Sequence, residues 1–202
     1  LHTNIAVCTL FGAVSGSSLS TAAAVGSVAY PEMTERGYDR QMVVGSLAGG
    51  GTLGLLIPPS LSLLIYGALT ETSIGRLFLA GILPGIILAS MFMIYIYLRC
   101  RQNPLLAPRI ESQLKITLII KNILAIWPFL IVVIAIMGSI SFGIATPTEA
   151  AGVGVIATII LGKFWGSLTL KKLVEAIYSG TLLYASIMFV VIGATILAQA
   201  VS

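Results

Sequence analysis

Two stretches of small and hydroxylated residues carry the groups that could do chemistry in this chain. The first is VSGSSLST (Val14 to Thr21), the second is GGGTLGLLIPPS (Gly49 to Ser60), and neither contains an ionisable side chain. Proton transfer and transition-metal ligation therefore have no group to use there. Hydroxyl and carbonyl oxygens can instead hold a hard cation, and backbone N–H groups at a helix N-terminus can hold a carboxylate. The chemistry favoured is binding of sodium together with an organic anion.

The second stretch lies inside an uncharged run from Gln41 to Thr70, which is long enough to cross a bilayer. The glycines between positions 49 and 54 permit unusual backbone angles, Thr52 adds a hydroxyl, and Pro58 and Pro59 free carbonyl groups. Unpaired backbone groups in hydrocarbon cost several kcal/mol each, so a non-helical stretch there must be buried by protein or line a wet cavity. We expect a discontinuous transmembrane helix with a ligand site at its break. The alternative is close helix packing at the glycines and plain kinks at the prolines.

The first stretch lies in the middle of an apolar run from Leu1 to Tyr30, and the apolar arm on either side of it is too short to span. Serine and threonine compete with helical backbone hydrogen bonds and suit turns and caps. We therefore expect a re-entrant hairpin that turns at Gly16 and Ser17 and leaves the membrane near Pro31. A straight span with a polar belt is the alternative.

The composition is that of an integral membrane protein. Hydrophobic residues make up 57% of the chain and charged residues 9%, against about 25% charged residues in soluble domains. Charge-free windows recur at residues 41–70, 77–98, 122–148 and 176–202, and every charged residue lies between them or at their margins. The fold class predicted is an all-α, polytopic membrane protein.

The distribution of basic residues predicts the orientation. One loop carries a single acid, Glu111, and five basic residues: Arg99, Arg101, Arg109, Lys115 and Lys121. The positive-inside rule places that loop in the cytoplasm, and Lys163, Lys171 and Lys172 agree after two further spans. The charged loop Pro31 to Arg40 is then cytoplasmic as well.

We expect five segments along the chain. They are a first re-entrant hairpin (1–31), a discontinuous helix (32–66), a transmembrane helix (67–101), a loop with a connecting transmembrane helix (102–146), and a helix, an interfacial arm helix over Leu168 to Gly180 and an outward helix (147–202). Asn103 to Lys115 is expected to lead into a surface helix. Thr146, Pro147 and Glu149 match a capping box at the start of the last segment. Because both chain ends lie in apolar stretches, we expect a fragment.

Enzyme classes find no support in the residues. An intramembrane serine protease would need a base beside Ser15, yet no histidine or lysine lies at membrane depth in another segment. The glycine run lacks the Lys and Ser or Thr of a phosphate-binding loop. Cys8 and Cys100 have no ligand spacing, so neither a disulfide nor a metal site is expected. We predict that the chain is not an enzyme and takes no organic cofactor.

Four motifs occur in a fixed order: GSSLSTAAAVGSVAYPEM, GGGTLGLLIPPSLSLLIYG, SIGRLFLAGILPG and GIATPTEAAGVGV. In this order they resemble the large membrane (permease) subunit of tripartite ATP-independent periplasmic (TRAP) transporters. The resemblance implies an elevator-type secondary transporter with two inverted repeats, of which this chain holds one hairpin and one broken helix. It also implies sodium-coupled uptake of organic acids across the bacterial inner membrane, with a small membrane subunit and a periplasmic substrate-binding protein as partners.

The site residues follow from the same resemblance. Sodium-binding positions are expected in the hairpin tip and the broken helix: Ser15, Gly16, Ser17, Ser18, Gly51, Thr52 and Gly54. Substrate-binding positions are expected at Ser18, Thr21, Pro58 and Pro59. Two other functions stay open on the residues alone, a passive channel lined by the break and a packing scaffold that transports nothing.

Overall fold

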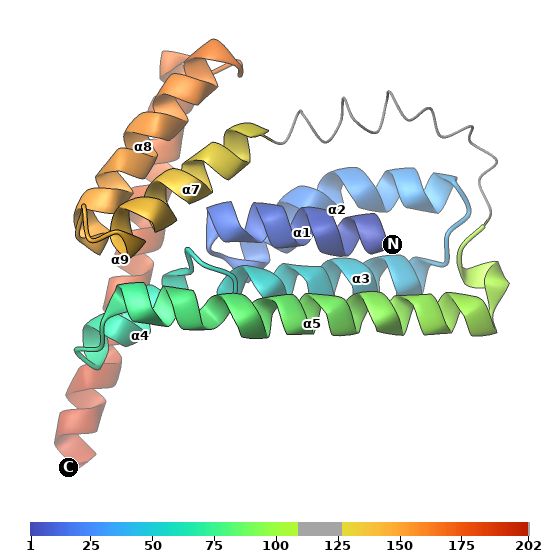
Figure 1. Ribbon diagram of the computed structural model, residues 1–202, viewed down its shortest axis with the longest axis horizontal. Helices are drawn as coiled ribbons and strands as arrows, with labels where there is room; N and C mark the ends of the chain where they lie inside the picture. Colours follow the sequence, from blue (N-terminus) through green and yellow to red (C-terminus); the bar gives the residue numbers. More distant parts are fainter. Residues whose placement is uncertain (109–126, 202) are drawn as a thin grey trace. The chain divides into compact units, whose positions relative to one another are not determined.

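The computed structural model describes residues 1–108 and 127–201, and the regular elements in these ranges are helices (Figure 1). The chain divides into two compact units, residues 1–155 and residues 156–202, and each is described by itself. The prediction of an all-α chain is confirmed. Among the described residues, three helices are long and apolar enough to cross a membrane: α5 (Ile74–Gln102), α8 (Pro147–Phe164) and α9 (Leu170–Val201). Together with the composition, they indicate a membrane protein.

A helical hairpin begins the first unit. Helix α1 (His2–Ser15) ends at Gly16, which has a positive φ of 61° and donates its N–H to the Gly12 carbonyl at 2.8 Å. Ser17 then caps α2 (Ser18–Glu35) by accepting the Ser20 N–H. The chain thus turns at the two residues that the sequence predicts. Helix α2 is longer than expected, because it continues through Pro31, an exposed position where the loss of one backbone hydrogen bond is tolerated.

Helix α3 (Arg40–Thr52) packs against both arms of the hairpin and against α5, and these helices run side by side in Figure 1. The core between them contains Ile5, Val25, Val43 and Ile96. One polar contact lies in this core, since the Asn4 amide donates to the Ser46 hydroxyl of α3 at 2.8 Å and both side chains are buried. Burial of apolar side chains and this hydrogen bond therefore hold the hairpin on α3.

Gly50 and Gly51 of α3 serve close packing, which corrects one prediction. They lie inside the helix, and the positive φ values of described glycines fall at positions 16, 37 and 143. A Cβ on Gly50 would lie 2.8 Å from the Cβ of Cys8, and one on Gly51 would lie 2.8 Å from the Cβ of Ala22. The alternative of close helix packing therefore holds for these two glycines. The break itself begins after Thr52.

The predicted break is present between α3 and α4 (Leu61–Leu69). One 3₁₀ turn, η1 (Leu53–Leu55), follows α3, and the next residues up to Ser60 are not helical. The segment does not continue as one helix through positions 49 to 60. We call residues 53–60 the helix break.

The other helices of the first unit follow the expected order. Helix α5 contains the charge-free window 77–98 and extends beyond both of its ends. After α5 comes a short 3₁₀ turn, η2 (Pro104–Leu106), and then α7 (Trp127–Ser141). The expected surface helix after Asn103 and the connecting transmembrane helix lie in part outside the described residues.

The predicted capping box is confirmed at the start of α8. The Thr146 N–H and hydroxyl both donate to Glu149 Oε2 at 2.8 Å, and the Glu149 N–H donates to Thr146 Oγ1 at 3.3 Å. This reciprocal pairing satisfies backbone donors that a helix start leaves open. Glu149 is thereby explained as a structural residue.

Helix α9 differs from the prediction of a separate arm helix and outward helix. It runs without interruption from Leu170 to Val201, through the boundary predicted at Gly180. A single glycine costs a helix only about 1 kcal/mol, and no proline stands nearby to break the backbone ladder. The arm helix and the outward segment are therefore one helix here.

Candidate functional site

The hairpin tip concentrates three oxygen atoms, which we call the oxygen cluster: Ser15 Oγ, Thr21 Oγ1 and the Ser17 carbonyl oxygen. Thr21 Oγ1 lies 2.7 Å from Ser15 Oγ and donates to the Ser17 carbonyl at 2.7 Å. Ser15 Oγ lies 3.2 Å from the same carbonyl. Two hydroxyls and a carbonyl therefore meet within hydrogen-bond distance of one another.

Local structure explains why these atoms meet. The left-handed conformation of Gly16 reverses the chain within two residues, which places the end of α1 beside the start of α2. Thr21 lies one helical turn after the Ser17 cap and is fully buried, so its hydroxyl bonds back to the carbonyl four residues earlier. The cluster therefore follows from the turn and the cap together.

The helix break interrupts the regular backbone hydrogen bonds opposite the hairpin tip. The Leu53 N–H bonds to the carbonyls of residues 50 and 51, which tightens the end of α3. Pro58 lacks the N–H that would bond to the Gly54 carbonyl in a continuing helix. Ser60 supplies two hydrogen bonds at the break, because its hydroxyl donates to the Leu55 carbonyl and accepts the Leu63 N–H. Ser60 thus satisfies one carbonyl group of the break and one N–H group at the start of α4.

The hairpin tip contacts the helix break at both ends of the break. A Cβ on Gly54 would lie 3.1 Å from Thr21 Oγ1 and 3.2 Å from the Ser17 carbonyl oxygen, so the missing side chain lets the oxygen cluster approach. On the other side of the break, the Gly16 carbonyl accepts the N–H of Leu61, the first residue of α4, at 3.4 Å. The two stretches singled out in the sequence thus form one site.

Several of the predicted sodium-site residues come together here. Ser15, Gly16 and Ser17 form the tip, and Gly54 lies against it. Gly51 lies one turn away, where a Cβ would be 3.1 Å from the Ser18 carbonyl oxygen. The hydroxyls of Ser15 and Ser17 make hydrogen bonds within the tip.

Thr52 does not join the tip through its hydroxyl. Its side chain is exposed, and Oγ1 donates to the Gly49 carbonyl at 2.7 Å, one turn back in its own helix. The backbone of Thr52 ends α3, but the side-chain oxygen that contacts the tip belongs to Thr21. The prediction picked the threonine next to the glycines in sequence, whereas the fold brings the other one to the break.

The predicted substrate residues also differ in whether they contact the hairpin tip. Thr21 is buried in the oxygen cluster, and Pro59 meets the tip, since its carbonyl oxygen lies 3.3 Å from a Cβ placed on Gly16. Pro58 is buried. Ser18 begins α2 and faces α3 with its carbonyl group. Thr21 therefore shares hydrogen bonds with Ser15 and Ser17, two residues predicted for sodium.

Sequence reasoning missed three contributors to the site. Gly12 lies against Gly54, where a Cβ on it would be only 2.7 Å from the Gly54 Cα. Ser60 and the Leu61 N–H complete the α4 end of the break. A serine directly before an apolar helical run is an N-cap signal, so Ser60 could have been found in the sequence. Gly12 gave no such signal, because its partner is distant in the chain.

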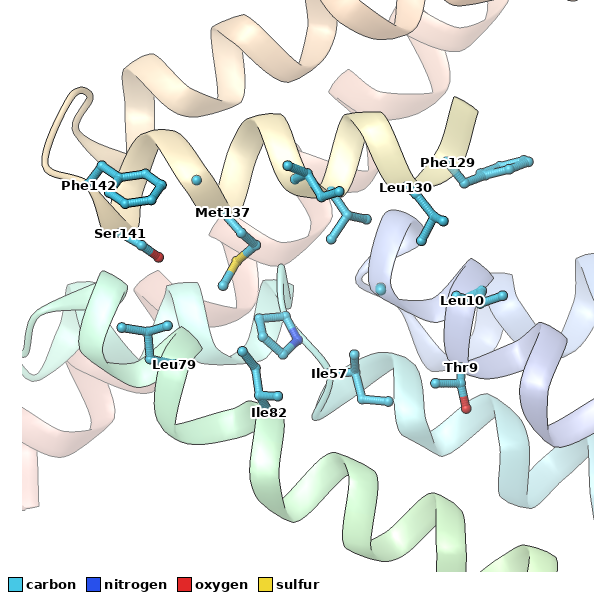
Figure 2. A pocket seen from close by; sticks show the side chains of 15 residues that line it. Thr9, Leu10, Ile57, Leu79, Ile82, Phe129, Leu130, Met137, Ser141 and Phe142 are labelled. Carbon is cyan, nitrogen blue, oxygen red and sulfur yellow. The ribbon is translucent and has the colours of Figure 1, made fainter. Parts of the chain in front are cut away.

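An apolar cavity borders the break but differs from it in chemistry. It has a volume of about 480 Å³ and lies between α1, the break, α5 and α7. Figure 2 shows Ile57, Leu79 and Ile82 facing Leu130 and Met137 across it. Its lining holds no charged side chain. The cavity therefore offers a carboxylate no ion pair.

A comparison with protein-family models shows which family the chain belongs to. The family model described as "Tripartite ATP-independent periplasmic transporter, DctM component" matches residues 2–202. This chain belongs to the DctM family. The TRAP resemblance drawn from the four motifs is thus confirmed, and the hairpin and helix break described above are features of a DctM-family chain.

Relatives within the DctM family carry several substrate names. The chain is 38% identical to the C4-dicarboxylate TRAP transporter large permease protein DctM of Pseudomonas aeruginosa, over 96% of this chain and 45% of that protein. It is 42% identical to the ectoine TRAP transporter large permease protein TeaC of Halomonas elongata, over 77% of this chain and 36% of that protein. It is 32% identical to the sialic acid TRAP transporter large permease protein SiaM of Vibrio cholerae, over 96% of this chain and 45% of that protein.

These DctM-family relatives are transporter permeases rather than enzymes, which agrees with the prediction of a non-enzyme. The chain spans about half the length of the curated relatives it matches, or less.

Proposed function

We propose that the chain is a sodium-binding part of a TRAP permease that imports organic acids across the bacterial inner membrane. The observation that carries this proposal is the docking of the oxygen cluster onto the helix break, at Gly54 and at Leu61. Hydroxyl and carbonyl oxygens suit a hard cation, and helix ends supply half-charges of the required sign. Sodium is the coupling ion in this proposal, and no organic cofactor takes part.

The oxygen cluster fits sodium for a simple reason. Hydroxyl groups rotate, so Ser15 and Thr21 can turn their lone pairs toward a cation while their backbone stays in place. The Ser17 carbonyl oxygen already lies within 3.2 Å of both hydroxyls. Backbone carbonyl groups of the break would complete the coordination. Binding would replace hydrogen bonds within the tip by ion contacts and so stiffen the tip against the break.

The substrate in this proposal is an organic acid whose carboxylate approaches the positive end of the α4 helix dipole, at the start of that helix. Relatives named for C4-dicarboxylate, ectoine and sialic acid support this class, since each of these compounds carries a carboxylate. Each net positive charge that enters the cell gains roughly 2.3 kcal/mol per 100 mV of membrane potential. Extra sodium ions can therefore drive an anion inward.

Two further parts of the proposal follow from membership of the DctM family. The permease works with a small membrane subunit and with a periplasmic binding protein that delivers the substrate. The hairpin is re-entrant and moves with the broken helix as an elevator-type transport domain. The lengths of α1 and α3, with 14 and 13 residues, support this, because neither reaches the roughly 20 residues of a full span.

The proposal predicts that uptake depends on a sodium gradient. The full-length permease and its two partners are reconstituted in vesicles, and uptake of labelled organic acids is followed with an inward sodium gradient or with equal sodium on both sides. We expect accumulation only with the gradient, and a further increase when the vesicle interior is made negative. Uptake that ignores both gradients would instead indicate a passive channel, and the absence of uptake for every acid tested would favour a scaffold.

A further inference from the structure

A second cavity, distinct from the apolar one, lies between α3 and α5 in the first unit. Its volume is about 630 Å³. Unlike the cavity beside the break, it has a polar end, formed by Asp39, Gln41, Tyr95 and Arg99, and an apolar end. None of these four residues belongs to the proposed sodium site.

The polar end holds one charge that pairs with no residue in the described part of the chain. Asp39 lies at the start of α3, where its carboxylate accepts the Met42 N–H at 2.9 Å as a helix cap. Arg99 lies in the last turn of α5, is exposed, and forms no salt bridge with any residue in the described ranges. Its guanidinium group is therefore free to bind an anion at the mouth of the cavity.

The apolar end is a groove made by missing side chains. A Cβ on Gly45 would have no atom within 4 Å, and a Cβ on Gly49 would meet only the ring of Phe92, at 3.5 Å or more. Met91 and Leu88 of α5 continue the lining. Since α5 is a candidate membrane span, this groove adjoins the hydrocarbon of the bilayer.

We propose that this cavity binds one anionic phospholipid, with its phosphate on Arg99 and an acyl chain along Gly45 and Gly49. The unpaired guanidinium matches a phosphate in charge and geometry, and the groove beside it matches an acyl chain in polarity. The basic residues that follow α5 in the sequence place this end of the helix at the cytoplasmic leaflet, whose anionic lipids supply such headgroups. The lipid would brace α3 against α5 behind the hairpin.

The test measures lipid binding by the purified full-length permease with native mass spectrometry, in the presence of phosphatidylglycerol or phosphatidylcholine. We expect phosphatidylglycerol to be retained preferentially. Arg99→Gln should weaken its binding about tenfold, since a charge-assisted hydrogen bond contributes at least one such factor. Arg101→Gln is the matched control, because Arg101 carries the same charge two residues later but does not line the cavity. It should bind phosphatidylglycerol like the unmodified protein.

A second variant tests the groove. Gly45→Leu adds an aliphatic side chain where space is open, so folding is preserved while the acyl chain is excluded. Its phosphatidylglycerol binding should fall as well. Equal losses for the two arginine variants, equal retention of both lipids, or competition by glycerol phosphate as strong as that by phosphatidylglycerol would each overturn the proposal. Because the readout is lipid binding, it does not depend on sodium-coupled transport.

Discussion

Thr21→Val should raise the sodium concentration needed for half-maximal uptake by about tenfold or more, which corresponds to about 1.4 kcal/mol of lost sodium binding. Valine keeps the shape of the buried side chain but removes the hydroxyl that joins Ser15 Oγ to the Ser17 carbonyl oxygen. The proposed ion site would lose one of its three cluster oxygens. The measurement is the sodium dependence of initial uptake rates in vesicles.

The matched control for this variant lies in the same helix. Thr34 donates its hydroxyl to the Tyr30 carbonyl at 2.7 Å, four residues earlier, in the same way as Thr21 donates to Ser17. Thr34 lies at the far end of α2, so Thr34→Val removes the same chemical group without touching the tip. It should leave the sodium dependence unchanged. If both variants shift the sodium dependence equally, the oxygen cluster has no special role.

Gly12→Ala should have the largest effect on folding of any single methyl group added to the hairpin. The new Cβ would lie 2.7 Å from the Gly54 Cα and 3.0 Å from the Gly54 nitrogen, and both are backbone atoms that cannot rotate away. Overpacking of this kind costs roughly 1–3 kcal/mol. Thermal unfolding of the purified permease in detergent should occur several degrees lower, and uptake should fall because the tip is pushed off the break.

Gly45→Ala controls for the general effect of adding a methyl group to a helix. Gly45 lies in α3, and its added Cβ would meet no atom within 4 Å. Alanine is the better helix former by up to about 1 kcal/mol, so this variant should be as stable as the unmodified protein or slightly more so. Unfolding of Gly12→Ala at the temperature of Gly45→Ala would contradict the close contact between the hairpin and the break.

The parts of the fold that could be predicted from sequence are those with a local cause. The turn at Gly16 and Ser17, the interruption before Ser60 and the capping box at Thr146 each depend on residues within a few positions of one another. Helix breakers, caps and charge-free windows record such effects directly. The all-helical membrane class follows from composition for the same reason.

The parts that could not be predicted depend on contacts between distant segments. Gly50 and Gly51 look like helix breakers in the sequence, yet they are helical because Cys8 and Ala22 pack against them. The choice of Thr21 over Thr52 as the oxygen at the break is decided by how α2 lies on α3. A single sequence does not record such pairings, so it does not show which hydroxyl contacts the break.

The account rests on one sodium ion being held where the oxygen cluster meets the helix break. Equilibrium binding of radioactive sodium to the purified full-length permease, compared with Thr21→Val, tests this most directly. We expect the variant to bind sodium about tenfold more weakly than the unmodified protein, while Thr34→Val binds it with unchanged affinity. An unchanged number of bound ions and an unchanged affinity in Thr21→Val would contradict the account.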